Sequence, residues 1–371
     1  YRVKNLRLEG WTVHTNNANA SAFRGFGINQ AAFSIESLID EIAEKLHMDR
    51  FDIRYRNALV AGDETVSGEI LRASVGIKET IRLCKEATEK AAAAYAAQYP
   101  QGTKRFGVGV ASGFKNVGAG KGKVDDAGAI LRLEPDGSVL VRVSAVDMGQ
   151  GIRTTMAQIA SETLGLPIDR LRIVTGDTLL TPKHGGAVGE RQTLISGNAM
   201  LLASKLFLAK LYEAAANCWG CAAGGMTLKN GALFTAAGER LGTLAELAER
   251  LHKAGAPDIE AEYNYVAPRT FALADVESRK TVPREEYRNY PAYAYTTQAA
   301  LVEVDTDTGN VRVLKVVAAH DVGRIINPVK IEGQIEGSCS MGQGYALSEE
   351  YVVERGVHRT TTYQSLGVPG I

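Results

Sequence analysis

Residues 128–164, GAILRLEPDGSVLVRVSAVDMGQGIRTTMAQIASETL, contain the patterns that decide the fold class. Apolar and polar residues alternate on both sides of Pro135–Gly137, which predicts strands at 128–134 and 138–145 joined by a hairpin turn. Over Thr154–Leu164 the apolar residues recur at helical spacing. Because a hairpin followed by a helix breaks the strict strand–helix alternation of a parallel α/β protein, we expect the α+β class.

The same two periodicities extend outward from this stretch. Helical spacing predicts further helices at residues 30–46, 48–59, 77–98, 192–218, 241–254 and 329–348. Alternation predicts further strands at residues 1–14, 106–111, 171–175, 292–305 and 310–320. The helix at 77–98 ends before Pro100, where the composition also changes, so we expect two mixed αβ subdomains with a boundary near residue 100.

The composition of the 371 residues excludes some classes of protein. Lys and Arg together number 42, as do Asp and Glu, and this balance argues against a nucleic-acid platform. No apolar run approaches 18 residues, so we expect no membrane span. The chain starts at Tyr1 without a signal peptide and ends on a loop-like Pro369-Gly370-Ile371, so we expect a piece of a longer polypeptide.

The four cysteines predict no disulfide framework and fit a reducing compartment, the cytoplasm. Cys218 and Cys221 have the CxxC spacing of a redox motif. They follow a helical stretch without a strand–helix–strand context, which favours a structural pair over a redox or zinc site. His184 and His320 stand alone in the sequence, so a structural role is favoured over metal ligation for both.

Glycine-rich phrases are the strongest functional signal. Met-Gly-Gln-Gly occurs at 148–151 and again at 341–344, and Ala-Phe-Arg-Gly-Phe-Gly at 22–27. Glycine lets the backbone approach a ligand, while Gln, Arg or Phe can recognise it. For 148–151 the alternative is a tight turn, and for 22–27 it is a loop held in the core by its two Phe rings. For the helix at 329–348, where each glycine costs about 1 kcal/mol relative to Ala, the alternative is close helix packing.

Residues 185–193, GGAVGERQT, form a further glycine-rich segment before a helix. Backbone N–H groups at a helix start and the guanidinium of Arg191 suit a phosphate or another anion. The alternative is an ordinary capped helix in which Thr193 is the cap and Glu190 is solvated.

The order of these phrases, with Asp321–Gly337 (DVGRIINPVKIEGQIEG) at the end, resembles the molybdopterin-binding subunit of the molybdenum hydroxylases, the xanthine dehydrogenase and aldehyde oxidoreductase family. The resemblance runs over nearly the whole chain. It implies that residues 1–100 are the C-terminal part of a first molybdopterin-binding domain and that 101–371 belong to a second one. The cofactor is then expected between the two subdomains.

The resemblance also implies roles for single residues. Gln150 is expected to reach the molybdenum ligands or the pterin, Phe26 to stack on an aromatic substrate, and Arg24 to line the centre. The residues expected to contact the cofactor are Phe23, Gly25, Gly27, Gly149, Gln150, Gly151, Gly186, Gly189, Arg191, Gln192, Thr193 and Gln334. No side chain is expected to ligate the metal, because the dithiolene of molybdopterin, in bacteria often its cytosine dinucleotide form, holds it.

The implied chemistry is the oxidative hydroxylation of an electron-poor carbon with oxygen from water. The family's general-base glutamate is expected beyond residue 371, so the isolated fragment is expected to be inactive. A [2Fe-2S] iron–sulfur subunit and an FAD subunit are expected as partners in a cytoplasmic hetero-oligomer, since no cluster-type Cys spacing occurs here.

Departures from the family pattern bear on the substrate. Gly25 and Phe26 stand where carbon monoxide dehydrogenases carry cysteine and serine, which argues against that activity. Asp147 stands where the xanthine enzymes commonly carry Glu, and Glu190 replaces the Ser of a Ser-Arg-Gln-Thr phrase of purine and nicotinate enzymes. The resemblance therefore favours purine catabolism or another small heteroaromatic substrate. An aldehyde oxidoreductase, a hydroxybenzoyl-CoA reductase-like enzyme and a non-catalytic scaffold homologue remain alternatives.

Overall fold

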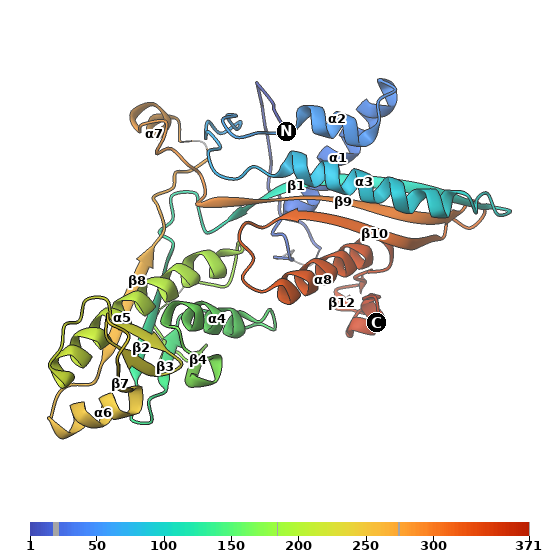
Figure 1. Ribbon diagram of the computed structural model, residues 1–371. Helices are drawn as coiled ribbons and strands as arrows, with labels where there is room; N and C mark the ends of the chain where they lie inside the picture. The colour runs from blue at the N-terminus through green and yellow to red at the C-terminus, as the bar shows by residue number, and fades with distance from the viewer. Residues whose placement is uncertain (18–21, 184, 274, 371) are drawn as a thin grey trace. The chain divides into compact units, whose positions relative to one another are not determined.

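Two sheets with separate hydrophobic cores divide the chain into two units (Figure 1). The computed structural model describes residues 1–17, 22–183, 185–273 and 275–370, so His184 lies outside the described residues. Unit 1 comprises Tyr1–Lys115, Ala274–Tyr287 and Ala292–Ile371, and unit 2 comprises Asn116–Leu273 and Arg288–Pro291. Helices and largely antiparallel strands occur in both units, so the predicted α+β class is confirmed.

The sheet of unit 1 has the order β1-β9-β10, built from β1 (Lys104–Val117), β9 (Ala292–Asp305) and β10 (Val311–Asp321). β9 and β10 form the predicted antiparallel hairpin. Helix α3 (Ile77–Ala96) lies along this sheet (Figure 1). Its Ile81 and Cys84 belong to the same buried cluster as Tyr295 and Ala299 of β9, which fastens the helix to the sheet.

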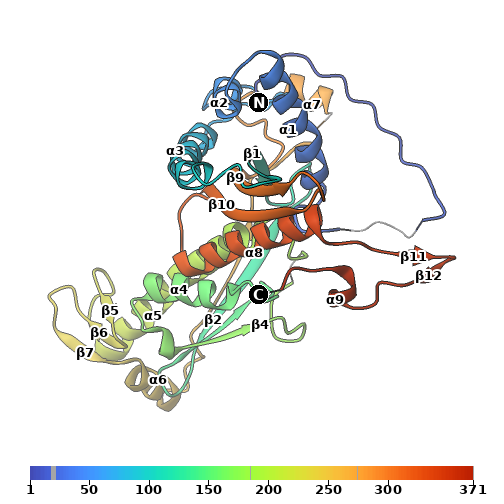
Figure 2. The same ribbon diagram turned by 90° about the vertical axis from the view of Figure 1, so that its right-hand side faces the viewer.

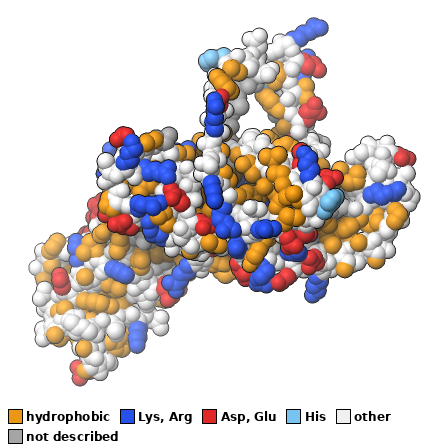
Figure 3. Space-filling model, turned by 90° about the horizontal axis from the view of Figure 1, so that it is seen from above, with side chains coloured by type: hydrophobic (Ala, Val, Ile, Leu, Met, Phe, Trp, Pro, Cys, Tyr) orange, Lys and Arg blue, Asp and Glu red, His pale blue; other side chains and the backbone are white. Residues whose placement is uncertain are grey.

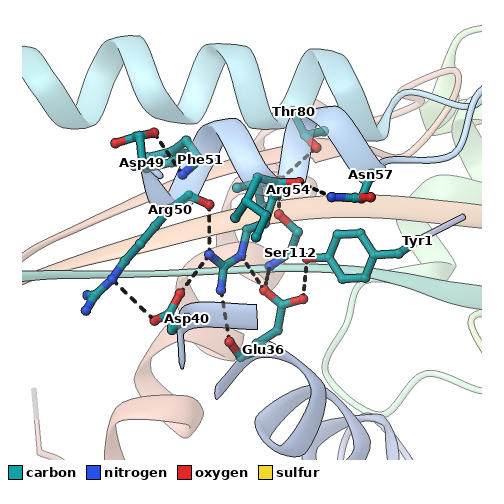
Figure 4. A network of polar contacts seen from close by, with 12 residues as sticks. Tyr1, Glu36, Asp40, Asp49, Arg50, Phe51, Arg54, Asn57, Thr80 and Ser112 are labelled. Carbon is teal, nitrogen blue, oxygen red and sulfur yellow. Dashed lines mark hydrogen bonds and ion pairs between the residues drawn. The ribbon is translucent and has the colours of Figure 1, made fainter. Parts of the chain in front are cut away.

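Helices α1 (Ile28–Lys45) and α2 (Arg50–Asn57) confirm two predicted helices of unit 1. α2 begins two residues later than predicted, because the Asp49 side chain caps it by accepting hydrogen bonds from the amides of Phe51 and Asp52 at 3.0 Å each. The two helices are joined by a buried ion pair between Glu36 and Arg54, which is drawn in Figure 4.

The strand predicted for residues 1–14 is wrong for the described structure, which places no strand there. The segment makes a backbone hydrogen bond from the Arg2 amide to the Asn57 carbonyl but forms no ladder. Alternation predicts that a segment has two faces, whereas a strand also needs a neighbour whose N–H and C=O groups complete its hydrogen bonds.

Helix α8 (Pro328–Leu347) follows β10 and runs beside it (Figure 2). Asn327 caps its first turn by accepting a hydrogen bond from the Lys330 amide at 3.0 Å. The Asp321 carboxylate, at the end of β10, accepts hydrogen bonds from the Ser74 hydroxyl at 2.9 Å and the Gly76 amide at 3.1 Å. This contact ties β10 to the start of α3.

Three short elements follow α8 in unit 1, and a further helix precedes β9. None of them was predicted from the sequence, because segments of two to six residues carry little periodicity. They are β11 (Val353–Glu354), β12 (Val357–His358), α9 (Tyr363–Leu366) and α7 (Val276–Thr281).

The side chain of His320, near the end of β10, is a neutral imidazole that accepts a hydrogen bond. Its Nε2 lies 3.1 Å from the amide nitrogen of Gln298 and 3.2 Å from the Thr296 hydroxyl. Because an amide N–H can only donate, Nε2 accepts. Burial lowers the pKa of His320, as expected for a structural histidine.

The lowered pKa predicts an acid-sensitive contribution to folding. The unfolded chain binds a proton at His320 more readily than the folded chain does. Folding stability should therefore fall as the pH drops below about 6.5, the ordinary histidine pKa, and this loss should be complete below the folded pKa. Urea titrations from pH 8 to 5 should show a shallower loss for His320→Gln than for the wild type. His14→Gln, at an exposed position, is the control; equal slopes in all three would contradict the prediction.

The sheet of unit 2 has the order β4-β3-β2-β8. Its strands are β2 (Asp126–Leu133), β3 (Val139–Val143), β4 (Leu171–Thr175) and β8 (Glu260–Val266). β2 and β3 form the predicted hairpin, whereas β3 and β4 are parallel because helix α4 (Ile152–Leu164) makes the crossover. α4 and α5 (Gly197–Trp219) share one large buried cluster with the sheet.

The predicted helix at 192–218 begins with a π-helical turn, Gln192–Ser196, before α5. Turns of this kind are rare and occur frequently at functional sites. By length and composition alone, Gln192–Trp219 could cross a membrane. Half of its most apolar stretch is buried, and residues of α5 belong to the core of unit 2, which accounts for its apolar composition. Cys218 and Cys221 are free, and both pack against this core.

A small sheet and a helix complete unit 2. The sheet consists of β5 (Thr227–Lys229), β6 (Ala232–Phe234) and β7 (Arg240–Thr243), and it is followed by α6 (Leu244–Lys253). The helix predicted from residue 241 starts later than expected, because Thr243 and Glu246 form a capping box that fixes its start. A single turn of 3-10 helix, Ile168–Arg170, precedes β4.

Candidate functional site

The Asp147–Gly151 loop of unit 2 is held by its own side chains. Asp147 Oδ1 accepts a hydrogen bond from the Gly149 amide at 2.9 Å, and its Oδ2 accepts one from the Arg153 amide at 3.2 Å. Gly149 and Gly151 have φ values of 101° and 80°, a region that glycine enters without strain. The carboxylate of Asp147 therefore stabilises the conformation of the loop, a role that the motif alone did not reveal.

Gln150 is engaged by this loop and by the next motif. Its Oε1 accepts from the Met148 amide at 2.5 Å, and its Nε2 donates to the Val146 carbonyl at 2.9 Å and to Gln192 Oε1 at 3.0 Å. Both N–H groups of the amide are thus in use. The hydrogen bond between Gln150 and Gln192 joins two motifs whose glutamines lie 42 residues apart in the sequence.

One atom of the Gln192 side-chain amide lacks a hydrogen-bond partner among the described residues. Its oxygen accepts from Gln150, but its buried Nε2 has no hydrogen-bond partner among the described residues. Gln192 is only 7% exposed, so water does not readily replace the missing acceptor. A buried donor without a partner costs about 1–3 kcal/mol, so a ligand whose binding moved this side chain far enough to bring an acceptor to Nε2 would recover that energy.

Arg191 holds the glycine-rich segment that precedes Gln192 in place. Its Nε lies 2.5 Å from Asp125 Oδ1, its Nη2 donates to the Asp126 carbonyl at 2.6 Å and its Nη1 to the Gly185 carbonyl at 3.1 Å. Both side chains of the ion pair are 3% exposed. In this arrangement Arg191 shapes the loop, and the predicted contact with an anion stays a prediction.

The other residues predicted in this segment line the same loop. Gly189 has a φ of 60°, and its carbonyl accepts a hydrogen bond from the Gly118 amide at 2.7 Å. Gly186 and Thr193 are exposed. The alternative in which Thr193 caps the helix is wrong, because the helix begins at Gln192 without a side-chain cap.

In unit 1, the predicted Phe23–Gly27 loop lies immediately before α1. The Phe26 amide donates to the Phe23 carbonyl at 2.8 Å, which closes a turn in which Gly25 and Gly27 have φ values of 101° and 93°. Phe26 itself has a φ of 53°, an unusual value for an aromatic residue, and its side chain is 74% exposed. The ring is therefore presented outward from the loop, which is not the core-held alternative.

The loop contacts α8 through two neighbouring side chains. Arg24 donates to the carbonyl of Gln334 at 2.9 Å and to its Oε1 at 2.8 Å. Phe23 stacks on Tyr345 with ring centroids 5.5 Å apart. Tyr345 was not predicted as a site residue, because a single aromatic residue in a helix carries no distinctive signal.

The α8 glycines meet different surroundings. A Cβ added at Gly344 would come within 2.6 Å of Pro369, and one at Gly337 would lie 3.5 Å from the Arg24 guanidinium. Added Cβ atoms at Gly333 and Gly342 would meet nothing within 4 Å among the described residues, and the same holds for Gly149. Close packing of protein atoms therefore accounts for only part of the glycine content of α8.

Each unit thus carries one group of predicted residues. Unit 2 brings Gln150 and Gln192 together, and unit 1 brings Arg24 and Gln334 together. Within the described residues no group of three or more His, Cys, Asp or Glu side chains could hold a metal ion. Lysine, arginine, aspartate and glutamate are interspersed on the face shown in Figure 3.

Comparison with known proteins decides the family. Residues 1–58 and residues 80–371 match two families that are both described as molybdopterin cofactor-binding domains. The chain belongs to the molybdopterin-binding large subunits of the molybdenum hydroxylases. The family predicted from the order of the motifs is therefore confirmed.

Relatives of known sequence and structure agree with this family. The xanthine dehydrogenase molybdenum-binding subunit of Escherichia coli O157:H7 is 32% identical over 92% of this chain and 44% of its own length. The quinoline 2-oxidoreductase of Pseudomonas putida 86 has a TM-score of 0.77 at 26% identity, over 94% of this chain and 44% of its own. The aldehyde oxidoreductase of Desulfovibrio desulfuricans has a TM-score of 0.75 at 28% identity, over 94% and 34%.

This molybdenum hydroxylase chain spans less than half the length of the curated xanthine dehydrogenase subunits that it matches. In each unit by itself, the donors and open glycine positions fit a ligand rich in acceptors, such as a pterin with a phosphate. The predicted domain boundary near residue 100 stays a prediction.

Proposed function

We propose that this chain is the molybdopterin-binding part of an enzyme that hydroxylates an electron-poor carbon of a purine or another N-heterocycle. Water would supply the oxygen, and an iron–sulfur subunit and an FAD subunit would carry the electrons away in a cytoplasmic hetero-oligomer. The similarity to a xanthine dehydrogenase subunit and to a quinoline oxidoreductase supports an N-heterocyclic substrate.

The unpaired Nε2 of Gln192 is the observation that carries this proposal. A scaffold that binds no cofactor has no use for this donor. An apolar residue here would remove the unmet hydrogen bond at Nε2, and the N–H of Gln150 that it freed would belong to a half-buried side chain that water can reach. A site for an acceptor-rich cofactor needs such a donor. The proposal therefore predicts that Gln192 serves binding at the expense of the stability of the cofactor-free chain.

The cofactor, when bound, would supply the two-electron redox chemistry and the site of oxygen transfer. The amides of Gly25 and Gly27 and the side chains of Gln192 and Gln334 would hold it. Gly149, where an added Cβ would meet nothing within 4 Å among the described residues, would let it come close to the backbone. Gln150 would act partly by orienting Gln192. The outward ring of Phe26 would stack on a flat substrate, a contact that every aromatic heterocycle can make.

Changing Gln192 to Glu should lower the cofactor content. The carboxylate still accepts a hydrogen bond from Gln150 Nε2, but the free donor becomes an acceptor that repels the oxygen atoms of the cofactor. Loss of a hydrogen bond to a charged group, about 1.5–3 kcal/mol, predicts at least a tenfold lower retention of the cofactor. Pterin fluorescence after oxidation, together with molybdenum analysis of the protein from its source, measures this.

Gln98→Glu is the matched control, because its amide donates to the Ala94 carbonyl on the exposed part of unit 1 and takes no part in the motifs. Its molybdenum and pterin content should equal that of the wild type. Wild-type protein that contains neither molybdenum nor pterin would contradict the proposal and favour the scaffold alternative. If the cofactor is present, transfer of ¹⁸O from water to purines, nicotinate or aldehydes identifies the substrate class.

A further inference from the structure

The Arg24 side chain makes three contacts with α8. Nη2 donates to the backbone carbonyl of Gln334 at 2.9 Å and to its side-chain Oε1 at 2.8 Å, while Nη1 lies 3.8 Å from Met341 Sδ. A guanidinium carries donors and no acceptor, so only the oxygen of the Gln334 amide can face it. The amide nitrogen Nε2 must therefore point away from Arg24.

The backbone around Arg24 is held independently of α8. Asn29 Nδ2 donates to the Arg24 carbonyl at 3.0 Å. A Cβ added at Gly25 would lie 2.3 Å from Asn29 Oδ1, so the close approach of this side chain requires glycine. These contacts with Asn29 set the shape of the loop, and this shape places the Arg24 guanidinium against α8.

Gln334 has no other constraint of this strength. It is exposed, and its Nε2 has no hydrogen-bond partner among the described residues. The terminal torsion of a free Gln side chain is broad and roughly two-fold, so without Arg24 the amide would present oxygen and nitrogen about equally. A cofactor would then meet the correct donor only part of the time.

We infer that Arg24 is a positioning residue that fixes the polarity of the Gln334 amide, with Oε1 held inward and Nε2 offered as a donor. The inference rests on the proposed function and makes it more specific. Nε2 would recognise an acceptor, such as a carbonyl oxygen, a ring nitrogen or a phosphate oxygen of the pterin. Arg24 itself would act through Gln334, without contact with the reacting atoms.

A double-mutant cycle on the holoenzyme tests this inference. Arg24→Met should lower the retained pterin about tenfold, because every torsion of the Gln334 side chain, and not only the terminal one, regains its freedom, and this freedom amounts to about one tenfold step in affinity. In the Gln334→Met background, Arg24→Met should have no further effect, since the amide that it orients is gone. A purely structural role of Arg24 in the loop would leave the same loss in both backgrounds.

Gln334→Glu separates binding from stability. The new carboxylate can pair with Arg24, so the melting temperature of the cofactor-free protein should not fall. Pterin retention should fall at least as far as in Arg24→Met, because the outward donor has become an acceptor. Arg24→Lys should give an intermediate loss. An ammonium can donate to both oxygens, as Nη2 does, but it lacks the fixed plane of the guanidinium and the second nitrogen that contacts Met341 Sδ.

Lys330→Met is the control, because it removes an exposed cation from the first turn of the same helix. It should retain the pterin like the wild type. Wild-type protein without pterin would overturn the proposed function itself. Wild-type protein with pterin, combined with full retention in Arg24→Met or with equal losses in both backgrounds, would overturn the positioning role alone.

Discussion

Replacing Arg54 with methionine should lower the free energy of unfolding of unit 1 by about 3–5 kcal/mol, the usual effect of leaving one partner of a buried ion pair uncompensated. Arg54 is fully buried in the network of Figure 4. Its Nε lies 2.6 Å from Glu36 Oε2 and its Nη1 lies 2.8 Å from Asp40 Oδ1. Glu36 would then remain buried without its main cation.

The same carboxylate also binds groups from outside α1 and α2. Glu36 Oε2 accepts the Ser112 amide of β1 at 2.9 Å, and Oε1 accepts the Tyr1 hydroxyl. Burial, together with the charge of Glu36, raises the pKa of Tyr1, so this hydroxyl remains protonated and donates. Loss of Arg54 should therefore loosen the first strand of the sheet as well as the two helices.

Hydrogen exchange at the Ser112 amide, followed by mass spectrometry at increasing denaturant, measures this prediction. Arg56→Met is the matched control, because it makes the same substitution at an exposed position of the same helix. Its exchange rate should match that of the wild type. An Arg54→Met protein with unchanged Ser112 protection would show that the network contributes nothing to stability.

Replacing Asp125 with asparagine should have an effect of similar size on unit 2. Asn keeps the shape of the side chain but removes the charge that compensates the buried Arg191, so we again expect a loss of about 3–5 kcal/mol. Asp125 Oδ2 also accepts the Ala119 amide at 2.6 Å. The loop around Ala119 and the loop at residues 185–191 should therefore become mobile together.

Protease sensitivity within residues 185–192 and exchange of the Ala119 amide report this change. Arg170→Met removes a cation at an exposed position of unit 2 and should change neither quantity. Because Gln192 follows Arg191 directly, the Asp125→Asn protein should also lose pterin. If the Asp125→Asn protein retained pterin although its loop had become protease-sensitive, the shape of the loop would not be required for cofactor binding.

The sequence predicted most elements of the fold because their determinants are local. Asp49 caps α2, the β9–β10 hairpin alternates over its full length, and α3 has one apolar face. It failed for residues 1–14, because a strand depends on a neighbour that no local pattern reveals. It also missed the π-helical turn at Gln192–Ser196, which has the same apolar spacing as an ordinary helix start.

The candidate site divides in the same way. Sequence motifs named Gln150, Gln192, Arg24 and Gln334, but their order along the chain does not say which pairs are in contact. The structure pairs Gln150 with Gln192 and Arg24 with Gln334. It also identifies Asp125 and Tyr345, whose partners lie 66 and 322 residues away in the sequence, Arg191 and Phe23 respectively.

By itself, therefore, the sequence determined the α+β class, the family and the types of side chain available to a ligand, since these follow from periodicity, glycine placement and motif order. Only the tertiary structure decided which amide atoms remain free to donate. A glutamine can present either end of its amide, and the choice depends on the neighbour that satisfies the other end. Gln150 makes that choice for Gln192, and Arg24 makes it for Gln334.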